Sequence, residues 1–253
     1  MATEKALALV VRGLDWSETS RITTLFTREF GKVRALAKGG RRLKSNFDVA
    51  FDLLTVCHVV LIRKHSEGLD LLTEARMEER FPILRQNLPA LYAGYYLAEL
   101  LADGSQDYDP HPRLFDSAIG TLRKLGEGGD QSQLLVTGFE LVWLQELGYR
   151  PRLDACAGCG ARLPLVEVGR VIFSPSSGGV LCPGCGLNIL DGREISLIAL
   201  TALQELTAAI EEKGTVPNAI PPGCMGEIRR VLGHMVSFVL GRRPRLLGYV
   251  DDR

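Results

Sequence analysis

Over the first 80 residues, short apolar or alternating stretches are separated by glycine-containing turns. In the stretch 20–27, Ile22, Thr24 and Phe26 share one face, which is the period-two pattern of a half-buried strand. Four further stretches have strand character, namely 6–12, 32–37, 51–62 and 69–75. Five strands of this length with Gly-rich turns predict a small closed barrel of the OB type, and an SH3-like barrel is the alternative.

Beyond Pro82 the hydrophobic period lengthens from two residues to between three and four. Leu91, Tyr95, Ala98 and Leu101 lie on one stripe of a predicted amphipathic helix. Gly148 follows a later helical stretch as a common C-terminal stop. The helices are predicted at 88–101, from 114 to 125, and at 132–147, 195–210 and 227–240. The chain is therefore predicted to be an α+β protein with a barrel domain at 1–80 and a helical domain at 81–253.

Residues 151–190 follow neither period and contain four of the six cysteines. Cys156-Ala-Gly-Cys159 and Cys182-Pro-Gly-Cys185 are two CxxC motifs that lie 22 residues apart. Such motifs bend the backbone so that two thiolates point at one centre, and two motifs supply the four sulfurs of a structural zinc site. The stretches 171–173 and 178–181 are predicted to form a β-hairpin between them. One structural zinc is therefore expected in a module at 150–190, inserted in the helical domain.

Other uses of these cysteines are an iron–sulfur cluster, a redox dithiol or unliganded core thiols. A redox dithiol needs only one CxxC motif in a thioredoxin-like setting, which the sequence lacks. Four sulfur ligands leave no open coordination position, so a catalytic metal is not expected. Cys57 lies in an apolar stretch and is interpreted as a core residue, and Cys224 also lies outside the two motifs.

The whole-chain charge favours no class of partner, because 30 basic residues balance 30 acidic residues. The hydrophobic fraction of 46% and the charged fraction of 24% are ordinary for a globular protein. The N-terminus lacks the pattern of a secretory signal, and no apolar run is long enough for a membrane span. A cytoplasmic protein without a membrane partner is expected. In that reducing setting, paired CxxC motifs indicate metal rather than disulfides.

Basic residues gather between positions 28 and 44, where seven of them accompany the single acid Glu29, a net charge of +6. If 32–37 is a strand, the basic side chains share one face and the small apolar ones share the other. A barrel face with an adjacent basic loop is typical of single-strand binding, and the alternative is a solvated charged surface. Trp16, Phe26, Phe30 and Phe47 are candidates for base stacking or for the core. The predicted DNA contacts are Arg28, Lys32, Arg34, Lys38, Arg41, Arg42 and Lys44.

Catalytic constellations are weak in this sequence. The densest acidic group, Asp103, Asp107 and Asp109, is interpreted as a polar loop that ends a helix. His58, His65, His111 and His234 are scattered, and a GxxxxGK[ST] phosphate loop is absent. The protein is therefore predicted not to be an enzyme. The alternatives are a zinc-dependent nuclease, which needs clustered carboxylates or an open metal position, and a zinc-ribbon transcription or ribosome-associated module.

The order of several short motifs resembles the RecO family, over roughly residues 5–200. The N-terminal motifs are Glu18-x-x-Arg21, Leu25-Phe26-Thr27-x-x-x-Gly31-Lys32 and Ala37-Lys38-Gly39-x-Arg41-Arg42. The later ones are Glu74, Tyr95-Tyr96-Leu97-x-Glu99-Leu100, Leu147-Gly148-Tyr149-x-Pro151 and Phe173-x-x-x-x-Gly178-Gly179-x-x-Cys182. None of these motifs is specific alone, and their order carries the resemblance. The last 50 residues match weakly, and Arg242, Arg243 and Arg245 are either a further phosphate contact or a solvated tail.

The resemblance implies an OB-fold domain followed by a helical domain that contains the zinc module. It implies a DNA repair and recombination mediator that binds single- and double-stranded DNA and anneals complementary strands. Expected partners are RecR, the acidic tail of single-stranded-DNA-binding protein, and indirectly RecA, which the mediator helps to load onto coated DNA. Some family members lack the cysteines, which favours a structural role for the metal.

Overall fold

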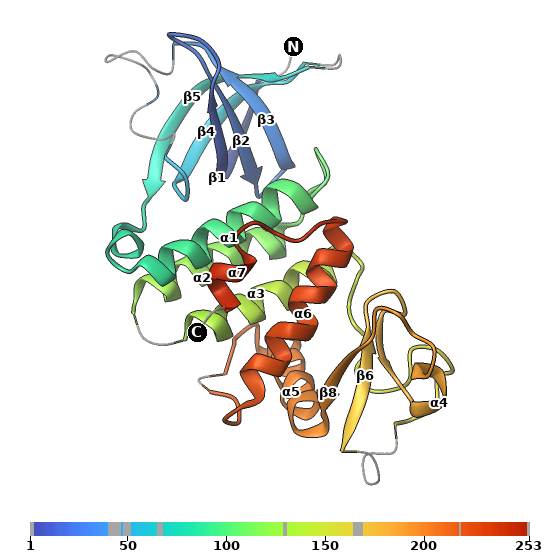
Figure 1. Ribbon diagram of the computed structural model, residues 1–253. Helices are drawn as coiled ribbons and strands as arrows, with labels where there is room; N and C mark the ends of the chain where they lie inside the picture. Colours follow the sequence, from blue (N-terminus) through green and yellow to red (C-terminus); the bar gives the residue numbers. More distant parts are fainter. Residues whose placement is uncertain are drawn as a thin grey trace. The chain divides into compact units, whose positions relative to one another are not determined.

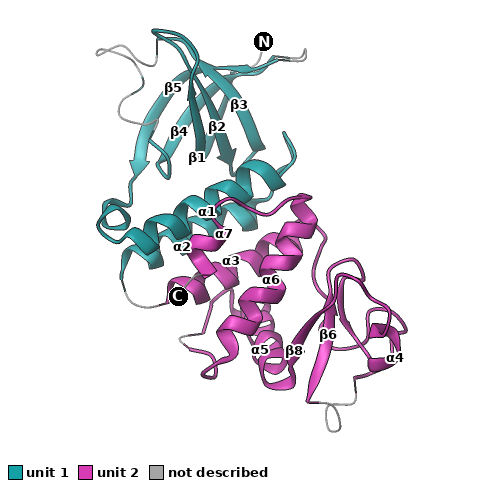
Figure 2. Ribbon diagram, in the orientation of Figure 1, with its two compact units in different colours: residues 1–128 teal, residues 129–253 magenta. Residues whose placement is uncertain are grey.

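The computed structural model describes residues 3–39, 47, 52–64, 68–128, 131–163, 169–217 and 219–251. The chain divides into two compact units, residues 1–128 and 129–253 (Figure 2). The first unit combines the strands of the N-terminal third with two helices, and the second contains further helices and a small sheet (Figure 1). The mixed α+β class predicted from the sequence is confirmed.

Five strands of the first unit form a closed barrel in the order β1-β2-β3-β5-β4. All neighbouring strands are antiparallel except β3 and β5, which run parallel. The barrel core consists of small and branched side chains, among them Ala8, Val33 and Leu61, each at most 1% exposed. The strands are β1 (Thr3–Asp15), β2 (Arg21–Thr27), β3 (Gly31–Ala37), β4 (Val56–Ile62) and β5 (Asp70–Glu79).

Strand β1 closes the barrel because it pairs with two neighbours along its length. Its first half, Thr3 to Leu9, pairs with β4, and Ala8 to Asp15 pairs with β2. The register shifts between Val10 and Arg12, where one strand of the pair gains a residue. Such a bulge bends and twists a strand, which is how a short sheet curls back on itself.

Strand β4 begins later in the chain than we predicted from its run of hydrophobic residues. The predicted strand 51–62 starts at Val56, because Leu54 has a left-handed backbone with φ 65°. The Leu54 side chain is 4% exposed and lies against Gly94 of the following helix, where an added Cβ would come within 2.8 Å of it. A contact between distant segments therefore turns this leucine out of the strand.

Two helices of the first unit follow the barrel strands. A 3₁₀ turn, η1 (Pro82–Gln86), leads into α1 (Leu88–Gly104), and α2 (Pro112–Gly126) follows. Asn87 caps α1, because its side-chain oxygen accepts a hydrogen bond from the Ala90 N–H at 3.3 Å. Helix α1 contacts β1 and β2, and Phe115 of α2 stacks on Phe26 of β2 with ring centroids 6.4 Å apart. Burial of these aromatic and aliphatic side chains holds the helices to the barrel.

The second unit combines helices with a three-stranded sheet of order β7-β6-β8. Trp143 and Phe139, both at most 1% exposed, and Leu203 are part of its apolar core. Arg229 of α6 forms buried ion pairs with Glu140 of α3 and, at 2.9 Å, with Asp251 of α7. The helices are α3 (Ser132–Glu146), α4 (Pro183–Gly186), α5 (Leu197–Lys213), α6 (Cys224–Leu240) and α7 (Leu247–Asp251). The strands are β6 (Arg170–Ser174), β7 (Gly179–Leu181) and β8 (Arg193–Ser196).

Most predicted elements match these closely, and the clearest error of type lies at the start of a predicted helix. The hairpin expected at 171–173 and 178–181 is β6 and β7. The predicted helix at 195–210 was wrong at its start, because 193–196 pairs with β6 as β8 and Ser196 then caps α5. The domain boundary at residue 80 stays a prediction. The compact units divide at 128/129 because α1 and α2 pack with the barrel strands.

Candidate metal centre and nucleic-acid interface

The first CxxC motif forms a closed turn. The Cys156 N–H donates to the Ala161 carbonyl at 2.9 Å, and the Gly160 N–H donates back to the Cys156 carbonyl at 2.9 Å. Gly160 has φ 76°, in the left-handed region that favours glycine. These bonds fold the motif so that the side chains of Cys156 and Cys159 project from the same turn.

Strand β7 holds this turn beside the second motif. The Ala157 N–H donates to the Val180 carbonyl at 2.8 Å, and the segment around Arg152 pairs with Gly179. A Cβ on Gly179 would come within 2.1 Å of the Arg152 carbonyl oxygen, so a side chain does not fit there. The strand leads directly into Cys182, which therefore lies next to the first turn.

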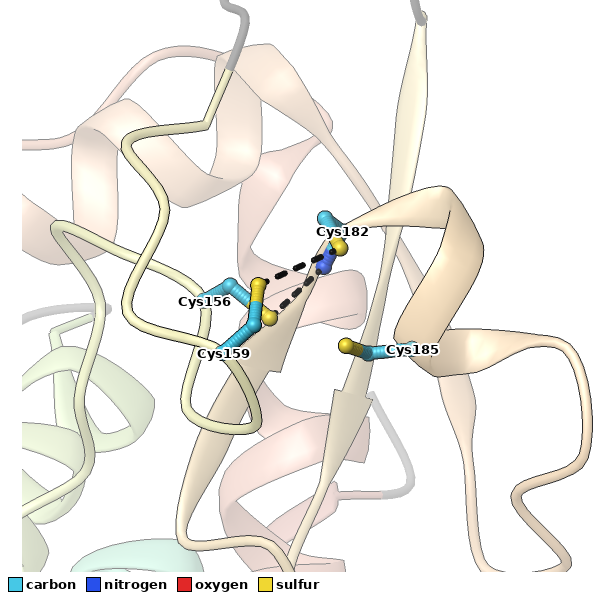
Figure 3. Close-up of side chains that lie close together, drawn as sticks. All are labelled: Cys156, Cys159, Cys182 and Cys185. Atoms are coloured by element: carbon cyan, nitrogen blue, oxygen red, sulfur yellow. Dashed lines mark hydrogen bonds between the residues drawn. The ribbon is translucent and has the colours of Figure 1, made fainter.

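The second CxxC motif spans the start of the short helix α4. Cys182 is the residue before the helix, and its carbonyl accepts a hydrogen bond from the Gly186 N–H at 2.9 Å. Pro183 occupies the first helical position, where its missing N–H costs nothing. This single turn directs Cys182 and Cys185 toward the first motif, as Figure 3 shows.

The four sulfur atoms meet at one point. They lie within 4.8 Å of one another, and Cys159 Sγ is 3.8 Å from Cys182 Sγ. Tetrahedral zinc–thiolate bonds of about 2.3 Å place neighbouring sulfurs about 3.8 Å apart. Gly158 is part of this fit, because a Cβ there would lie 3.2 Å from Cys185 Sγ. The four cysteines could therefore hold one metal ion.

Electrostatics at the cluster also suit a cation. Burial alone would raise the pKa of Cys156, but backbone N–H groups, including that of Cys182 at 3.3 Å from its sulfur, lower this pKa to about 6. The pKa of Cys185 is raised to about 12, chiefly by hydrogen bonds with Cys182 and the other two thiols. Four thiolates so close together repel one another, and a bound divalent cation supplies the charge that allows all of them to ionise.

Cys57 and Cys224 lie apart from this cluster, as the sequence predicted. Cys57 is 1% exposed in the barrel core, and burial raises its pKa to about 12. Cys224 is 4% exposed at the start of α6. Among the described residues, the four clustered cysteines form the one group of His, Cys, Asp or Glu side chains suited to a metal.

Strand β3 has the two faces that its sequence predicts. Val33, Ala35 and Ala37 are buried in the barrel core, while Arg34 is exposed and Lys32 is partly exposed on the other face. Lys38, just after the strand, is also exposed. The basic side chains therefore point away from the core.

Three of the predicted DNA contacts are ion-paired within the first unit. Arg28 makes two hydrogen bonds to the Asp116 carboxylate at 2.9 and 3.0 Å, which raise the pKa of its guanidinium. Lys32 and Arg34 both pair with Asp107, at 3.3 and 3.1 Å. Lys32 also donates to the Ala102 carbonyl at 3.1 Å and is only 14% exposed at its side chain. These pairs couple the barrel to the helices that follow it.

The remaining predicted contacts lie at and beyond the end of β3. Lys38 is described and exposed, whereas Arg41, Arg42 and Lys44 lie outside the described residues. Arg242, Arg243 and Arg245, near the C-terminus, are exposed.

The acidic partners of this face were not recognised from the sequence. Asp107 pairs with β3, Asp103 pairs with Arg12 of β1 at 2.6 Å, and Asp109 lies 3.1 Å from the His111 ring. Asp103 belongs to α1 rather than to a loop, which corrects the earlier interpretation. The concentration of aspartates at 103–109 was the available signal, but the partners of Asp103 and Asp107 lie about 70 to 90 residues earlier in the chain.

These features define a class of protein that joins a small β-barrel carrying exposed basic residues to helices and a compact four-cysteine module. The family model described as "Recombination protein O N terminal" matches residues 1–81, and "Recombination protein O C terminal" matches residues 85–247. The chain therefore belongs to the RecO family, whose role is in DNA repair and recombination.

Sequence similarity to known proteins extends over most or nearly all of the chain. The chain is 35% identical to the DNA repair protein RecO of Rhodopirellula baltica, over 98% of this chain and 98% of that protein. It is 34% identical to the DNA repair protein RecO of Roseiflexus sp., over 97% of this chain and 84% of that protein. The DNA repair protein RecO of Desulfitobacterium hafniense is 37% identical over 84% of this chain and 77% of its own length. The family expected from the sequence motifs is thus confirmed.

None of the described helices is both long enough and apolar enough to cross a membrane.

Proposed function

We propose that this chain binds single- and double-stranded DNA and anneals complementary strands during recombinational repair. Its family and the full-length similarity to proteins named DNA repair protein RecO support this proposal. The observation that carries it is the basic end of β3, where exposed Lys38 is followed in the sequence by Arg41, Arg42 and Lys44. Such a cluster attracts phosphates without regard to base sequence.

The barrel is assigned to the OB type within this proposal, as a domain at about residues 1–80. A closed five-stranded barrel of order β1-β2-β3-β5-β4 fits that type. OB barrels bind single strands along a strand face and its adjoining loops, and here β3 leads directly into the basic segment.

The seven basic residues proposed to contact DNA form two groups, which differ in whether an ion pair within the protein is known. Lys38, Arg41, Arg42 and Lys44 are proposed to meet phosphates. Arg28, Lys32 and Arg34 are engaged by Asp116 and Asp107, so in the free protein their charge is already partly neutralised. They join the DNA contact only if a phosphate replaces the carboxylate.

The metal is proposed to be one zinc ion with a structural role. Cys156, Cys159, Cys182 and Cys185 would complete a tetrahedral shell, which leaves no position for a substrate or water. The ion would hold together two turns that are otherwise joined mainly through β7.

Catalysis is not part of the proposed function. Asp103 and Asp107, the acids that a nuclease would need, are paired with barrel cations. Within this proposal, the protein acts by binding DNA and through its partners. These are proposed to be RecR, the acidic tail of single-stranded-DNA-binding protein bound by the helical domain, and through them RecA, all in the cytoplasm at the nucleoid.

An annealing assay tests this function. Complementary strands coated with single-stranded-DNA-binding protein are mixed with and without the full-length chain, in the absence of ATP. Acceleration of duplex formation supports the proposal. Unchanged annealing contradicts it, and cleavage products on addition of a divalent metal would instead indicate a nuclease.

A further inference from the structure

Four aromatic residues, close in sequence to the basic residues, were candidates for stacking on bases. Their side chains differ in exposure to solvent. Phe26 is fully buried and Phe47 is 5% exposed, both in apolar cores of the first unit. Phe30 is partly buried against the same barrel core. Trp16, in contrast, is 65% exposed at the tip of the β1–β2 hairpin. Among these four, only the Trp16 ring offers a free face to a ligand.

The turn that carries Trp16 is held by hydrogen bonds. The N–H groups of Trp16 and Ser17 donate to the Ser20 carbonyl at 3.1 and 3.2 Å, and the Ser20 N–H donates to Ser17 Oγ at 3.1 Å. An exposed tryptophan on an ordered turn presents its large flat ring at little entropic cost on binding. Leu14, two residues earlier, is 60% exposed as well.

Strand register brings this hairpin to the level of Lys38, the residue that follows β3. Asp15 of β1 pairs with Arg21 of β2, and Arg21 pairs in turn with Ala37 of β3. Trp16 therefore follows the end of β1 at the level where Lys38 follows the end of β3. Because β2 lies between them, the backbones of β1 and β3 are two strand spacings apart in this row, about 10 Å. Within this row Asp15 is paired with Arg21 at 3.4 Å, so its charge is partly neutralised.

From this placement we infer that Trp16 is a base-stacking residue that lies beside the proposed phosphate contact of Lys38. The ligand is a single strand of nucleic acid, whose phosphates meet the basic residues while an unpaired base lies on the indole. This inference rests on the proposed function and adds to it the group that distinguishes a single strand from a duplex, because paired bases offer no free face.

Charge favours nucleic acid over an apolar protein partner on this surface. Exposed Lys38 lies at the level of the hairpin, and in the sequence Arg41, Arg42 and Lys44 follow it within six residues. A polyanion neutralises such basic residues, whereas an apolar partner would leave them uncompensated. Aromatic and basic groups side by side are the usual means of binding single strands without base preference.

The test compares two oligonucleotides of equal length, one of thymidines and one of abasic sites with the same phosphates. Replacing Trp16→Ala should weaken binding to the thymidine strand about tenfold. Binding to the abasic strand should stay within twofold of wild type. Trp16→Phe should restore part of the loss, and Leu14→Ala is the matched control for removal of an exposed apolar side chain. Thermal melting checks that each variant keeps its fold.

Fluorescence gives a second readout. The chain contains two tryptophans, and Trp143 is fully buried in the other unit, so solvent-exposed emission reports on Trp16. The thymidine strand should quench this emission and the abasic strand should not.

Two results would overturn the inference. If Trp16→Ala binds the thymidine strand like wild type, stacking is refuted, and a protein partner becomes the alternative for the exposed ring. If Trp16→Ala loses both strands equally, the indole acts through the hairpin and not on bases. Failure of the wild-type chain to bind either strand at low salt would instead refute the proposed function, and this inference with it.

Discussion

The cysteine cluster and the basic face of β3 differ in how far the surrounding fold alters their sequence signals. The four cysteines meet within 4.8 Å, each from the motif that predicted it. Of seven predicted basic contacts, three pair with Asp107 or Asp116, which lie in the segments that follow the barrel. The four cysteines of the first site gather as their spacing predicts, whereas part of the charge of the second is neutralised by residues far along the chain.

The difference follows from the range of the interactions. A CxxC turn is fixed by its own backbone hydrogen bonds, such as that between Cys156 and Ala161. A charged side chain has no such local requirement and pairs with whichever opposite charge the fold brings near. A motif whose conformation is fixed by local hydrogen bonds therefore predicts a site more reliably than a count of charged residues does.

The largest expected effect is on the cysteine module. Replacing Cys182→Ser should remove the metal and lower the free energy of unfolding of the second unit, on the order of 3–5 kcal/mol. The barrel belongs to the other unit, so DNA binding should fall much less. Metal analysis and thermal melting measure both effects.

Cys224→Ala is the matched control for this variant, because it removes a buried cysteine outside the cluster. Its metal content should equal that of the wild type. Purified wild-type chain with well under half an equivalent of zinc and no iron would refute the metal centre.

A second experiment tests the part of the basic segment beyond β3. Replacing Arg41, Arg42 and Lys44 together by Ala should flatten the log–log salt dependence of single-strand binding by about two units and weaken binding about 100-fold near 0.1 M salt. The loss should be the same for all base sequences, because phosphates carry no sequence information. If the salt titrations of wild type and variant coincide, the segment is only a solvated charge run.

A third variant tests whether a basic residue that is ion-paired in the free protein can bind phosphate once its partner is removed. Its effect should be smaller than those above. Asp107→Asn removes the carboxylate that pairs with Lys32 and Arg34. Because Arg34 is 60% exposed at its side chain, it should become available to phosphate and steepen the salt dependence by about 0.7 unit. Affinity should rise a few-fold at low salt.

Asp109→Asn makes the same charge change in the same segment, but its partner in the structure is His111. It should shift the salt dependence less than Asp107→Asn does. Equal shifts for the two variants would mean that net charge alone, and not release of a paired arginine, changes the affinity.

Much of the fold could be predicted because period and turn residues are local signals. The alternation Val33, Ala35, Ala37 identified the core face of β3 correctly. The errors arose where distant contacts decide the conformation. Leu54 leaves its strand to lie against Gly94, and residues 193–196 become a strand because β6 is beside them.

The candidate nucleic-acid interface could also be predicted only in part. Exposure of Trp16 and burial of Phe26 could not be distinguished from the sequence, because the burial of an aromatic residue depends on what the fold places over it. Phe26 is covered by Phe115, whereas Trp16 extends beyond the paired strands.

We propose that DNA binds to the barrel of the first unit and that the cysteine module has a structural role. Photo-cross-linking of the full-length chain to a thymidine oligonucleotide, followed by peptide mapping, tests this most directly. We expect adducts on the peptides that contain Trp16 and residues 38–44. Adducts concentrated between residues 150 and 190 would contradict the account, because DNA would then contact the metal-binding module itself.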